Sequence, residues 1–336
     1  MKPSAIVPTL LLPVAAAFSG PAVHVDPGIP AFFPSSAPLS GAFHAIGSDA
    51  MRSVTERWEA ILVHAHPGVV FTYDIEKNFN SIPGLGDGRA QFAPLGRLPS
   101  KPEYVAFVEE TGYPPSAIRV SNCTYGGGPN KDWPHPHAVF VNRDNPLSRL
   151  TLAQVDAIFS KTRRRGYPVE VTKWGQLGLT GDWADRPIVL YGVNGGEGNR
   201  GPANFFRERA LGSGVLKELH GAKSEEFVVP MIAADRFGIG FTGLPFETPG
   251  VKHLALAENE SAPYSDASLK DVVAGKYPLS RVTYVHFDRP PGMPVEPVLK
   301  ELLRVALSRE GQEAAIAEGY LPLSAEDAAK ERAKLE

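Results

Sequence analysis

The residue types and motifs that are scarce in this 336-residue sequence narrow its class first. A single cysteine, Cys123, excludes an internal disulfide and any zinc cluster built from cysteines. The formal net charge is only −3, so the strongly basic face of a general nucleic-acid binder is not indicated. No G-x-S-x-G motif and no repeat of fixed period occurs. These absences argue against disulfide-rich, nucleic-acid-binding and serine-hydrolase classes.

Only the N-terminus carries a long apolar run. Residues 5–18 follow Lys2 and are interrupted by prolines, which makes the run too short to span a bilayer comfortably. A basic start, a short apolar stretch and small residues up to Ala17 are typical of a secretory signal peptide. We predict a signal peptide over residues 1–19, cleaved after Ala17 or Ser19, and hence a periplasmic or secreted protein. No cysteine follows directly, so no lipid anchor is expected. Residues 20–41, rich in Pro, Ser and Ala, are predicted to be a flexible lead-in.

The rest of the chain alternates between strand-like and helix-like segments. Apolar residues at helical spacing follow Ser48 and Thr151, which are both suitable N-caps, and a further apolar stripe covers 299–307. Strand-like runs are found at 42–46, 69–75, 138–142, 186–193 and 237–243. This alternation predicts an α/β fold with mostly parallel sheets.

Three loops at helix starts carry glycine or short polar side chains. They begin at Gly47, Gly96 and Gly195. Such loops can hold a small anion through backbone N–H groups, hydroxyls and the helix dipole, or they can simply cap helices. The third contains Gly196-x-Gly198-x-x-Gly201, a pattern also found in dinucleotide-binding turns. That interpretation requires an acidic residue at the end of the next strand, and here the acids precede the apolar run.

Two histidine pairs, His64-x-His66 and His135-Pro-His137, raise the question of a metal site. The first pair ends a predicted helix, where residues two apart do not share a face. The second lies in a proline-rich loop with no carboxylate or third histidine next to it in sequence. We therefore predict no metal site and no cofactor.

Longer blocks of the sequence show a family resemblance. The sequence resembles the phosphate-binding proteins of bacterial ABC transporters from about residue 42 to 323, and the matching blocks come in the family's order. The motifs that carry the resemblance are Gly47-SDAM with Trp58 downstream, Gly88-RAQFAPLGR, Asn145-PLSRLTLAQVDAIFS, Trp174-GQLGLTGDWADRPIVLYG, Asp235-RFGIGFTG and Lys276-YPLSR with the segment up to Leu323.

The resemblance implies a type II periplasmic-binding-protein fold. Two lobes of sheet flanked by helices would be joined by a hinge of two crossing strands, with a ligand between them. Lobe I would comprise residues 42–125 and 258–336, and lobe II residues 126–257. It further implies a monomer that is not an enzyme, that binds a small molecule such as an inorganic oxyanion, and that docks on an ABC permease.

The resemblance also places the ligand loops, and several of them depart from the family's pattern. Ser48 matches a family hydroxyl, whereas asparagines replace a run of serines in the second loop and Gly96–Arg97 lacks the family's serine. In the fourth loop Val193 stands where the family has arginine. This loop is then the counterpart of a phosphate-binding loop, and its Gly-x-Gly-x-x-Gly pattern does not indicate a dinucleotide. The candidate ligand-binding residues are Ser48, Asp49, Asn78, Asn80, Gly96, Arg97, Asn194, Glu197, Gly198, Asn199 and Arg200.

Val193 and Glu197 both disfavour a phosphate dianion. Loss of a charge-assisted arginine contact costs about 1.5–3 kcal/mol. A carboxylate about 4 Å from the anion adds repulsion of about 4 kcal/mol at an effective dielectric near 20. Three hypotheses therefore stay open: a phosphate-type receptor in which Arg97 or Arg200 compensates, a receptor for a neutral or cationic solute, and a secreted interaction protein without a small ligand.

Overall fold

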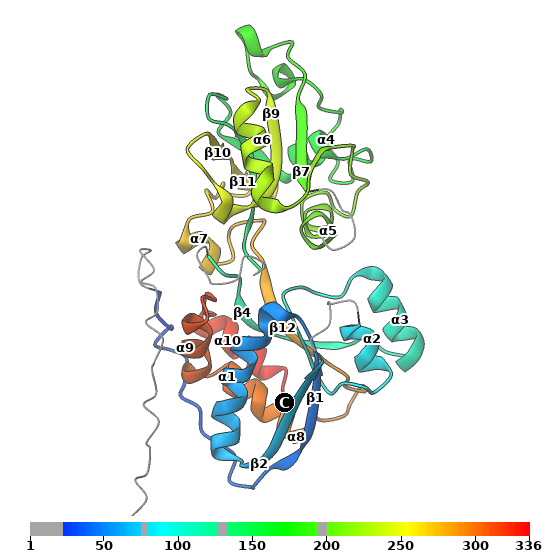
Figure 1. The fold of residues 1–336 in the computed structure, drawn as a ribbon, viewed down its shortest axis with the longest axis vertical. Helices are drawn as coiled ribbons and strands as arrows, with labels where there is room; N and C mark the ends of the chain where they lie inside the picture. Colours follow the sequence, from blue (N-terminus) through cyan, green and yellow to red (C-terminus); the bar gives the residue numbers. More distant parts are fainter. Residues whose placement is uncertain (1–22, 75–79, 126–133, 194–199) are drawn as a thin grey trace, which may run out of the picture.

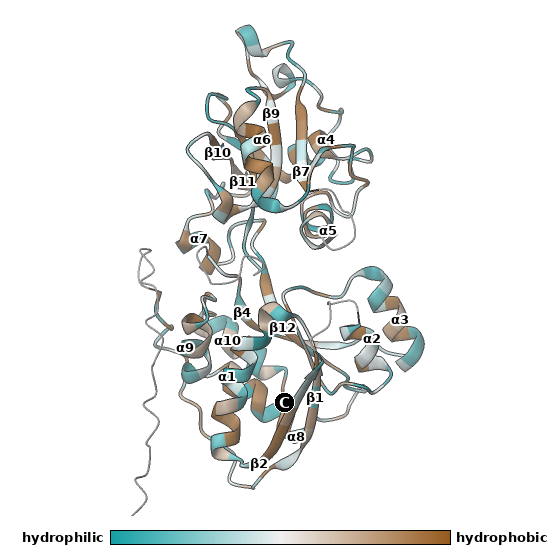
Figure 2. Cartoon of the chain, viewed as in Figure 1, coloured by the Kyte–Doolittle hydropathy of each residue, from teal (hydrophilic) through white to brown (hydrophobic). Residues whose placement is uncertain are grey.

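The computed structural model describes residues 23–336 apart from 75–79, 126–133 and 194–199. Figure 1 shows two α/β lobes arranged along the long axis of the molecule. The apolar residues gather on the inward faces of the strands and helices of each lobe (Figure 2). Within the described ranges, no helix combines the length and the apolarity needed to cross a membrane.

The first lobe is built from both ends of the described chain. Its strands are β1 (Ser40–Ile46), β2 (Gly68–Asp74), β3 (Ala93–Leu95), β4 (Ser116–Asn122) and β12 (Val282–Phe287). Its helices are α1 (Asp49–Ala65), α2 (Ser81–Gly86), α3 (Lys101–Thr111), α8 (Pro297–Ala306), α9 (Arg309–Ala317) and α10 (Ala325–Ala333). Strands β1 and β2 pair in parallel, whereas β12 lies between β3 and β4 and is antiparallel to both.

Helix α1 shows how the sequence pattern builds this lobe. Met51, Val54, Trp58 and Leu62 recur every three to four residues and are fully buried, as the helical periodicity predicts. The Trp58 indole N–H donates a hydrogen bond to the Gly311 carbonyl oxygen at 2.9 Å, which fastens α1 to α9. The buried face of α1 therefore fixes where its N-terminus points, and Figure 1 shows that this end lies toward the second lobe.

The second lobe holds a five-stranded sheet in the order β10-β5-β9-β7-β8 and a two-stranded pair, β11-β6. The strands are β5 (His137–Asn142), β6 (Arg149–Thr151), β7 (Val189–Val193), β8 (His220–Ala222), β9 (Gly238–Gly243), β10 (Val251–His253) and β11 (Ala255–Ala257). The α-helices are α4 (Leu152–Phe159), α5 (Arg200–Arg209), α6 (Val228–Ala234) and α7 (Leu269–Val273). The 3-10 turns are η1 (Trp174–Leu177), η2 (Gly181–Trp183), η3 (Glu225–Phe227) and η4 (Leu244–Phe246).

The sheets are mixed, so the α/β class is confirmed but the prediction of mostly parallel sheets is wrong. In the second lobe β7 runs parallel to β8 and β9, while β5 is antiparallel to both β9 and β10. The path of the chain explains the antiparallel pairing of β4 with β12. The chain runs toward the second lobe along β4 and returns from it along β12. Alternation of helices and strands in the sequence does not report such reversals.

Two adjacent chain segments join the lobes. Beyond β4 and before β12 the backbone continues as a pair, in which Cys123 N–H donates to the Arg281 carbonyl at 3.0 Å. Further along, the His137 N–H at the start of β5 donates to the Leu279 carbonyl at 3.1 Å. This pair corresponds to the predicted hinge of two crossing strands, and the lobe boundary at 125/126 stays a prediction. Val272 of α7 and Leu279 pack in the second lobe's core, although the predicted boundary at 257/258 gave them to lobe I.

Residues 23–39 belong to the folded unit, in contrast to the flexible lead-in expected over 20–41. Ile29 is fully buried in the first lobe's core. The backbone N–H groups of Phe32 and Ser35 donate to carboxylates of α9 and α8 at 2.7 Å each. Composition alone suggested a linker, but these anchors tie the segment to the helices.

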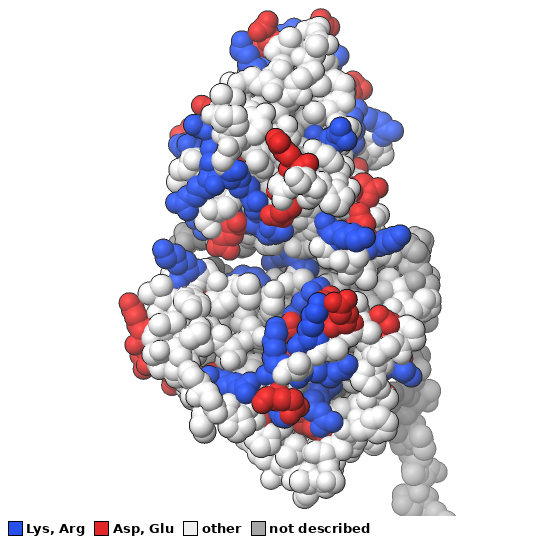
Figure 3. All heavy atoms as spheres, turned by 180° about the vertical axis from the view of Figure 1, so that it is seen from behind, with Lys and Arg blue, Asp and Glu red and all other residues white. Residues whose placement is uncertain are grey.

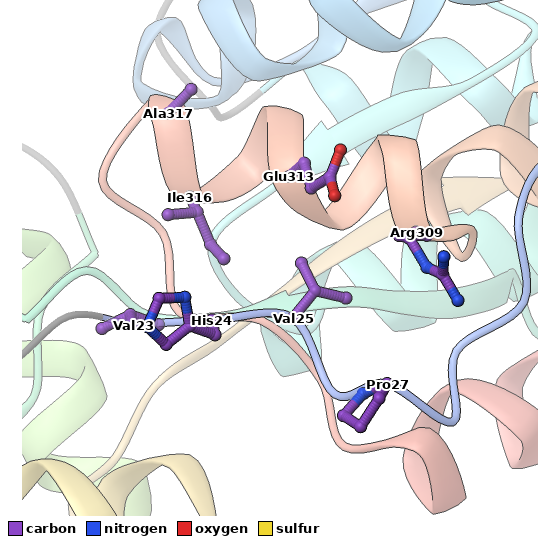
Figure 4. A pocket seen from close by; sticks show the side chains of 8 residues that line it. All are labelled: Val23, His24, Val25, Pro27, Arg309, Glu313, Ile316 and Ala317. Carbon is purple, nitrogen blue, oxygen red and sulfur yellow. The ribbon is translucent and has the colours of Figure 1, made fainter.

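Figure 4 shows the pocket that this segment forms with α9. It is lined by Val23, His24, Val25, Pro27, Arg309, Glu313, Ile316 and Ala317. The predicted signal peptide, residues 1–19, lies outside the described residues.

Candidate functional site between the lobes

The first predicted loop lies at the start of α1. Ser48 is the N-cap residue and is buried, and its backbone N–H donates to the Pro94 carbonyl at 2.9 Å. Its hydroxyl makes no capping hydrogen bond and lies 3.4 Å from the Asp49 carboxylate. Asp49 is exposed and accepts a hydrogen bond from the Ala50 N–H at 2.8 Å. The helix start therefore offers a hydroxyl and the positive end of the helix dipole, with one carboxylate beside them.

The second and third predicted loops contribute less to a shared site. Asn80 is exposed at the N-cap of α2, where its side chain makes no capping bond. Gly96 faces the second lobe, since a Cβ at Gly96 would stand 3.0 Å from the Pro134 Cβ. The Arg97 guanidinium forms a two-pronged ion pair with Glu103, with nitrogen–oxygen distances of 2.6 and 2.7 Å. A ligand role for Arg97 stays a prediction, and it would require Arg97 to give up this pair.

The fourth predicted loop is only partly described. Val193, at the end of β7, is buried among apolar side chains and brings no charge to the cleft. Arg200 begins α5, and its side chain is outside the described part. The predicted ligand residues Asn78, Asn194, Glu197, Gly198 and Asn199 lie outside the described residues.

A cation that sequence reasoning missed lies between the lobes. Arg281 precedes β12, its side chain donates to the Gly96 carbonyl at 3.5 Å, and its guanidinium carbon is 5.0 Å from the centre of the Phe205 ring on α5. Burial lowers the pKa of Arg281, and the negative charge of Glu225 opposes that shift. Arg281 thus connects the first lobe, the hinge and α5. The only sequence signal for it was its place in the Lys276–Arg281 family motif.

A cluster of three polar side chains, His135, His137 and Glu225, lies at the hinge end of the second lobe. The Nε2 atoms of His135 and His137 are 3.4 and 3.5 Å from Glu225 Oε1. His137 starts β5, opposite Gly243 at the end of β9, and Glu225 begins η3. The Gly243 N–H donates to the same Glu225 oxygen at 3.0 Å, which fixes the carboxylate toward the histidines.

The electrostatics of this cluster differ from those of ordinary surface residues. Burial lowers the pKa of His137 to about 3, so that its imidazole is neutral near pH 7. Burial alone would raise the pKa of Glu225, but the hydrogen bond from His135 and the charges of His137, His135 and Arg281 lower it to about 2. Near pH 7 the cluster therefore presents the Glu225 carboxylate beside the neutral imidazole of His137.

The space-filling view supports a cleft at this level of the molecule. Figure 3 shows a notch between the two lobes, with Lys and Arg side chains and also acidic side chains along its edges. Several polar groups described above belong to elements that meet where the lobes join. They are Ser48, Gly96, Arg281 and the histidine–glutamate cluster. Such an arrangement suits a small polar ligand held between two lobes.

Comparison with known proteins defines the class and then the family. The model of the PBP superfamily domain matches residues 135–310, which places the chain in a superfamily of two-lobed binding proteins. The chain is 34% identical over 307 residues to the phosphate-binding protein PstS of Pseudomonas aeruginosa, covering 91% of this chain and 90% of that protein. It belongs to the PstS family of phosphate-binding proteins.

Solved structures agree on the fold. PstS from Borrelia burgdorferi matches with a TM-score of 0.59 at 15% identity, over 85% of this chain and 100% of that one. An ABC-type phosphate transport receptor from Vibrio cholerae matches with a TM-score of 0.56 at 16% identity, over 83% of this chain and 99% of that one. The two-lobed fold expected from the sequence is thereby confirmed.

Proposed function

We propose that this protein is an extracytoplasmic solute receptor of the phosphate-transporter type, which clamps a small oxyanion between its lobes and delivers it to an ABC permease. The similarity to PstS across 91% of the chain carries the proposal. The relatives are named as binding proteins and receptors, and we infer that this chain likewise binds without catalysis.

The described cleft supplies part of what an oxyanion requires. The Ser48 hydroxyl lies at the N-terminus of α1, where negative charge is stabilised by about 0.3–1 kcal/mol or more. The Ala50 and Met51 N–H groups there already donate to the Asp49 carboxylate and the Ser48 carbonyl, so a bound oxyanion would have to displace the Asp49 carboxylate. Arg281 adds a cation between the lobes. Binding would bring the ligand's charge against both groups, which favours closure of the lobes around it.

Other charges in the cleft weaken the match to a phosphate dianion. Glu225 is ionised close to Arg281, and Arg97 is paired with Glu103. These features support an altered or weakened oxyanion site. A receptor for a neutral or cationic solute is the alternative that they favour.

Titration calorimetry on the exported, ligand-free chain tests the proposal. We expect heat of binding with phosphate or sulfate, at one site per chain, and no heat with amino acids or polyamines. Binding of a polyamine or amino acid without competition by phosphate would support the altered-ligand alternative. Absence of heat across the whole panel would contradict a receptor function and favour an interaction protein.

Export and partnership form part of the same proposal. N-terminal sequencing of the mature protein from the periplasm should start near Phe18 or Gly20. Retention of Met1 would contradict export by a cleaved signal peptide. Co-purification with permease subunits in the presence of the bound oxyanion is the expected sign of the transport role.

A further inference from the structure

The histidine–glutamate cluster of the second lobe has the composition and spacing of a metal site. We propose that His135, His137 and Glu225 bind one divalent transition-metal ion of the zinc class, through the Nε2 atoms of both histidines and Oε1 of the glutamate. The proposal concerns these side chains alone and stands whether or not an oxyanion is bound elsewhere in the cleft.

The distances fit coordination better than hydrogen bonding. Zinc–nitrogen and zinc–oxygen bonds of about 2.0–2.2 Å in tetrahedral geometry put ligand atoms about 3.3–3.6 Å apart. Glu225 Oε1 lies 3.4 Å from His135 Nε2 and 3.5 Å from His137 Nε2, and the three ligand atoms all lie within 4.8 Å of one another. A charge-assisted hydrogen bond would be closer to about 2.7–2.9 Å.

His137 gives an independent reason to expect a ligand. It is fully buried, and neither of its ring nitrogens has a hydrogen-bond partner among the described residues. A buried polar group without a partner is costly, and in native proteins such a group calls for an explanation, of which a bound ion is one. Its Nε2 is the atom nearest to Glu225, so a metal at that position would satisfy it.

The surroundings hold the ligands in place. The rings of His135 and His137 are nearly parallel, with centroids 6.0 Å apart, because residues two apart on an extended segment point the same way. Phe246 packs edge-on against His135 and Phe205 against His137, with centroid distances of 5.5 and 5.0 Å. This apolar shell limits water access, and the two imidazole ligands favour zinc-class cations over hard ones.

Gly243 makes room for the cluster. A Cβ at that position would lie 2.1 Å from His135 Nε2, closer than any real contact. The Gly243 N–H also orients the Glu225 carboxylate at 3.0 Å, as outer hydrogen bonds commonly do for metal ligands. Because Glu225 keeps 14% of its side chain exposed, the cluster also remains reachable from solvent.

Three protein ligands leave one tetrahedral position for water or a small ligand. An ion bound there would add two positive charges beside Arg281, in a cleft where Val193 replaces a family arginine. Phosphate affinity measured with and without the metal would report the effect of these added charges on anion binding, separately from metal binding itself.

The test uses the full exported chain, stripped with a chelator and titrated with Zn²⁺ in phosphate-free buffer. We expect one ion per chain with a Kd below about 1 µM. Co²⁺ should give the visible absorption of a tetrahedral nitrogen–oxygen site. Glu225→Gln and His135→Gln should each weaken Zn²⁺ binding by more than about 100-fold, a larger loss than removal of an outer-shell partner causes.

Glu226→Gln is the matched control, because Glu226 is the exposed neighbour in the same 3-10 turn and should leave Zn²⁺ binding unchanged. Circular dichroism shows which variants are folded, and either ligand variant decides the question if the other fails to fold. The proposal is overturned if the wild-type chain takes up no Zn²⁺. Equal affinity in wild type and Glu225→Gln would overturn it as well, since the metal would then bind at other histidines.

Discussion

Replacing His137 by leucine separates the stability of the metal-free protein from its response to metal. In the metal-free chain the His137 side chain is fully buried, and within the described ranges neither ring nitrogen has a hydrogen-bond partner. Leucine fills similar space against Phe205 and leaves the backbone hydrogen bond to Leu279 intact. Removing a buried polar group that lacks partners should therefore raise the free energy of unfolding by about 1–3 kcal/mol.

Metal should reverse the order of stability. Zn²⁺ at 1,000 times its Kd stabilises a protein that binds it only when folded by about 4.1 kcal/mol. Wild type should gain that amount, and His137→Leu should gain almost nothing. Urea unfolding of chelator-treated protein, with and without Zn²⁺, measures both differences. A metal-free His137→Leu protein that is less stable than wild type by more than about 1 kcal/mol would refute the reasoning, because it would show that the imidazole is satisfied.

Three further predictions concern the rest of the molecule. Trp58→Phe removes the indole donor to the buried Gly311 carbonyl and should lower the free energy of unfolding by about 1–3 kcal/mol, as measured by urea denaturation. The hydrogen bond from His253 to Glu247 at 2.8 Å raises the pKa of His253. Burial alone would raise the pKa of Glu247, but the same hydrogen bond lowers it. Their mutual stabilisation should be largest between about pH 4.5 and 6.5. It should fall as pH rises through the raised histidine pKa, and His253→Gln should flatten this part of the stability profile; an unchanged profile would contradict the pairing. Glu197→Ser should strengthen phosphate binding in calorimetry at least about tenfold if the ligand is an oxyanion, and weaker binding would point to a neutral or cationic solute.

The sequence was a good guide wherever local chemistry decides structure. The structure confirms the predicted helix starts at Ser48 and Thr151 and the burial of Trp58, although only Thr151 makes the side-chain capping bond. The direction of strands was not predictable in the same way, because β4 and β12 are paired by tertiary contacts between distant segments. Residues 23–39 were misjudged because a Pro-rich composition does not reveal that Ile29 fills the core.

The candidate site also combines features set by local sequence with features set by contacts between distant segments. The helix start at Ser48 is a local pattern and was predicted correctly, while its role in binding a ligand stays a prediction. The cluster was missed because Glu225 lies 90 residues from His135 in sequence. The pairing of β5 with β9 sets His137 opposite Gly243, and the hydrogen bond from Gly243 to Glu225 of η3 brings the carboxylate to the histidines. The sequence showed two histidines in a proline-rich loop without a neighbouring carboxylate. The carboxylate that completes the set comes from across the sheet.

A crystal structure of the mature chain grown with phosphate tests the receptor proposal most directly. We expect one phosphate between the lobes, within hydrogen-bond distance of the Ser48 hydroxyl and the first N–H groups of α1. Crystals grown at saturating phosphate that show no anion at the start of α1, or an anion only on the outer surface, would contradict the proposal that this protein clamps an oxyanion between its lobes.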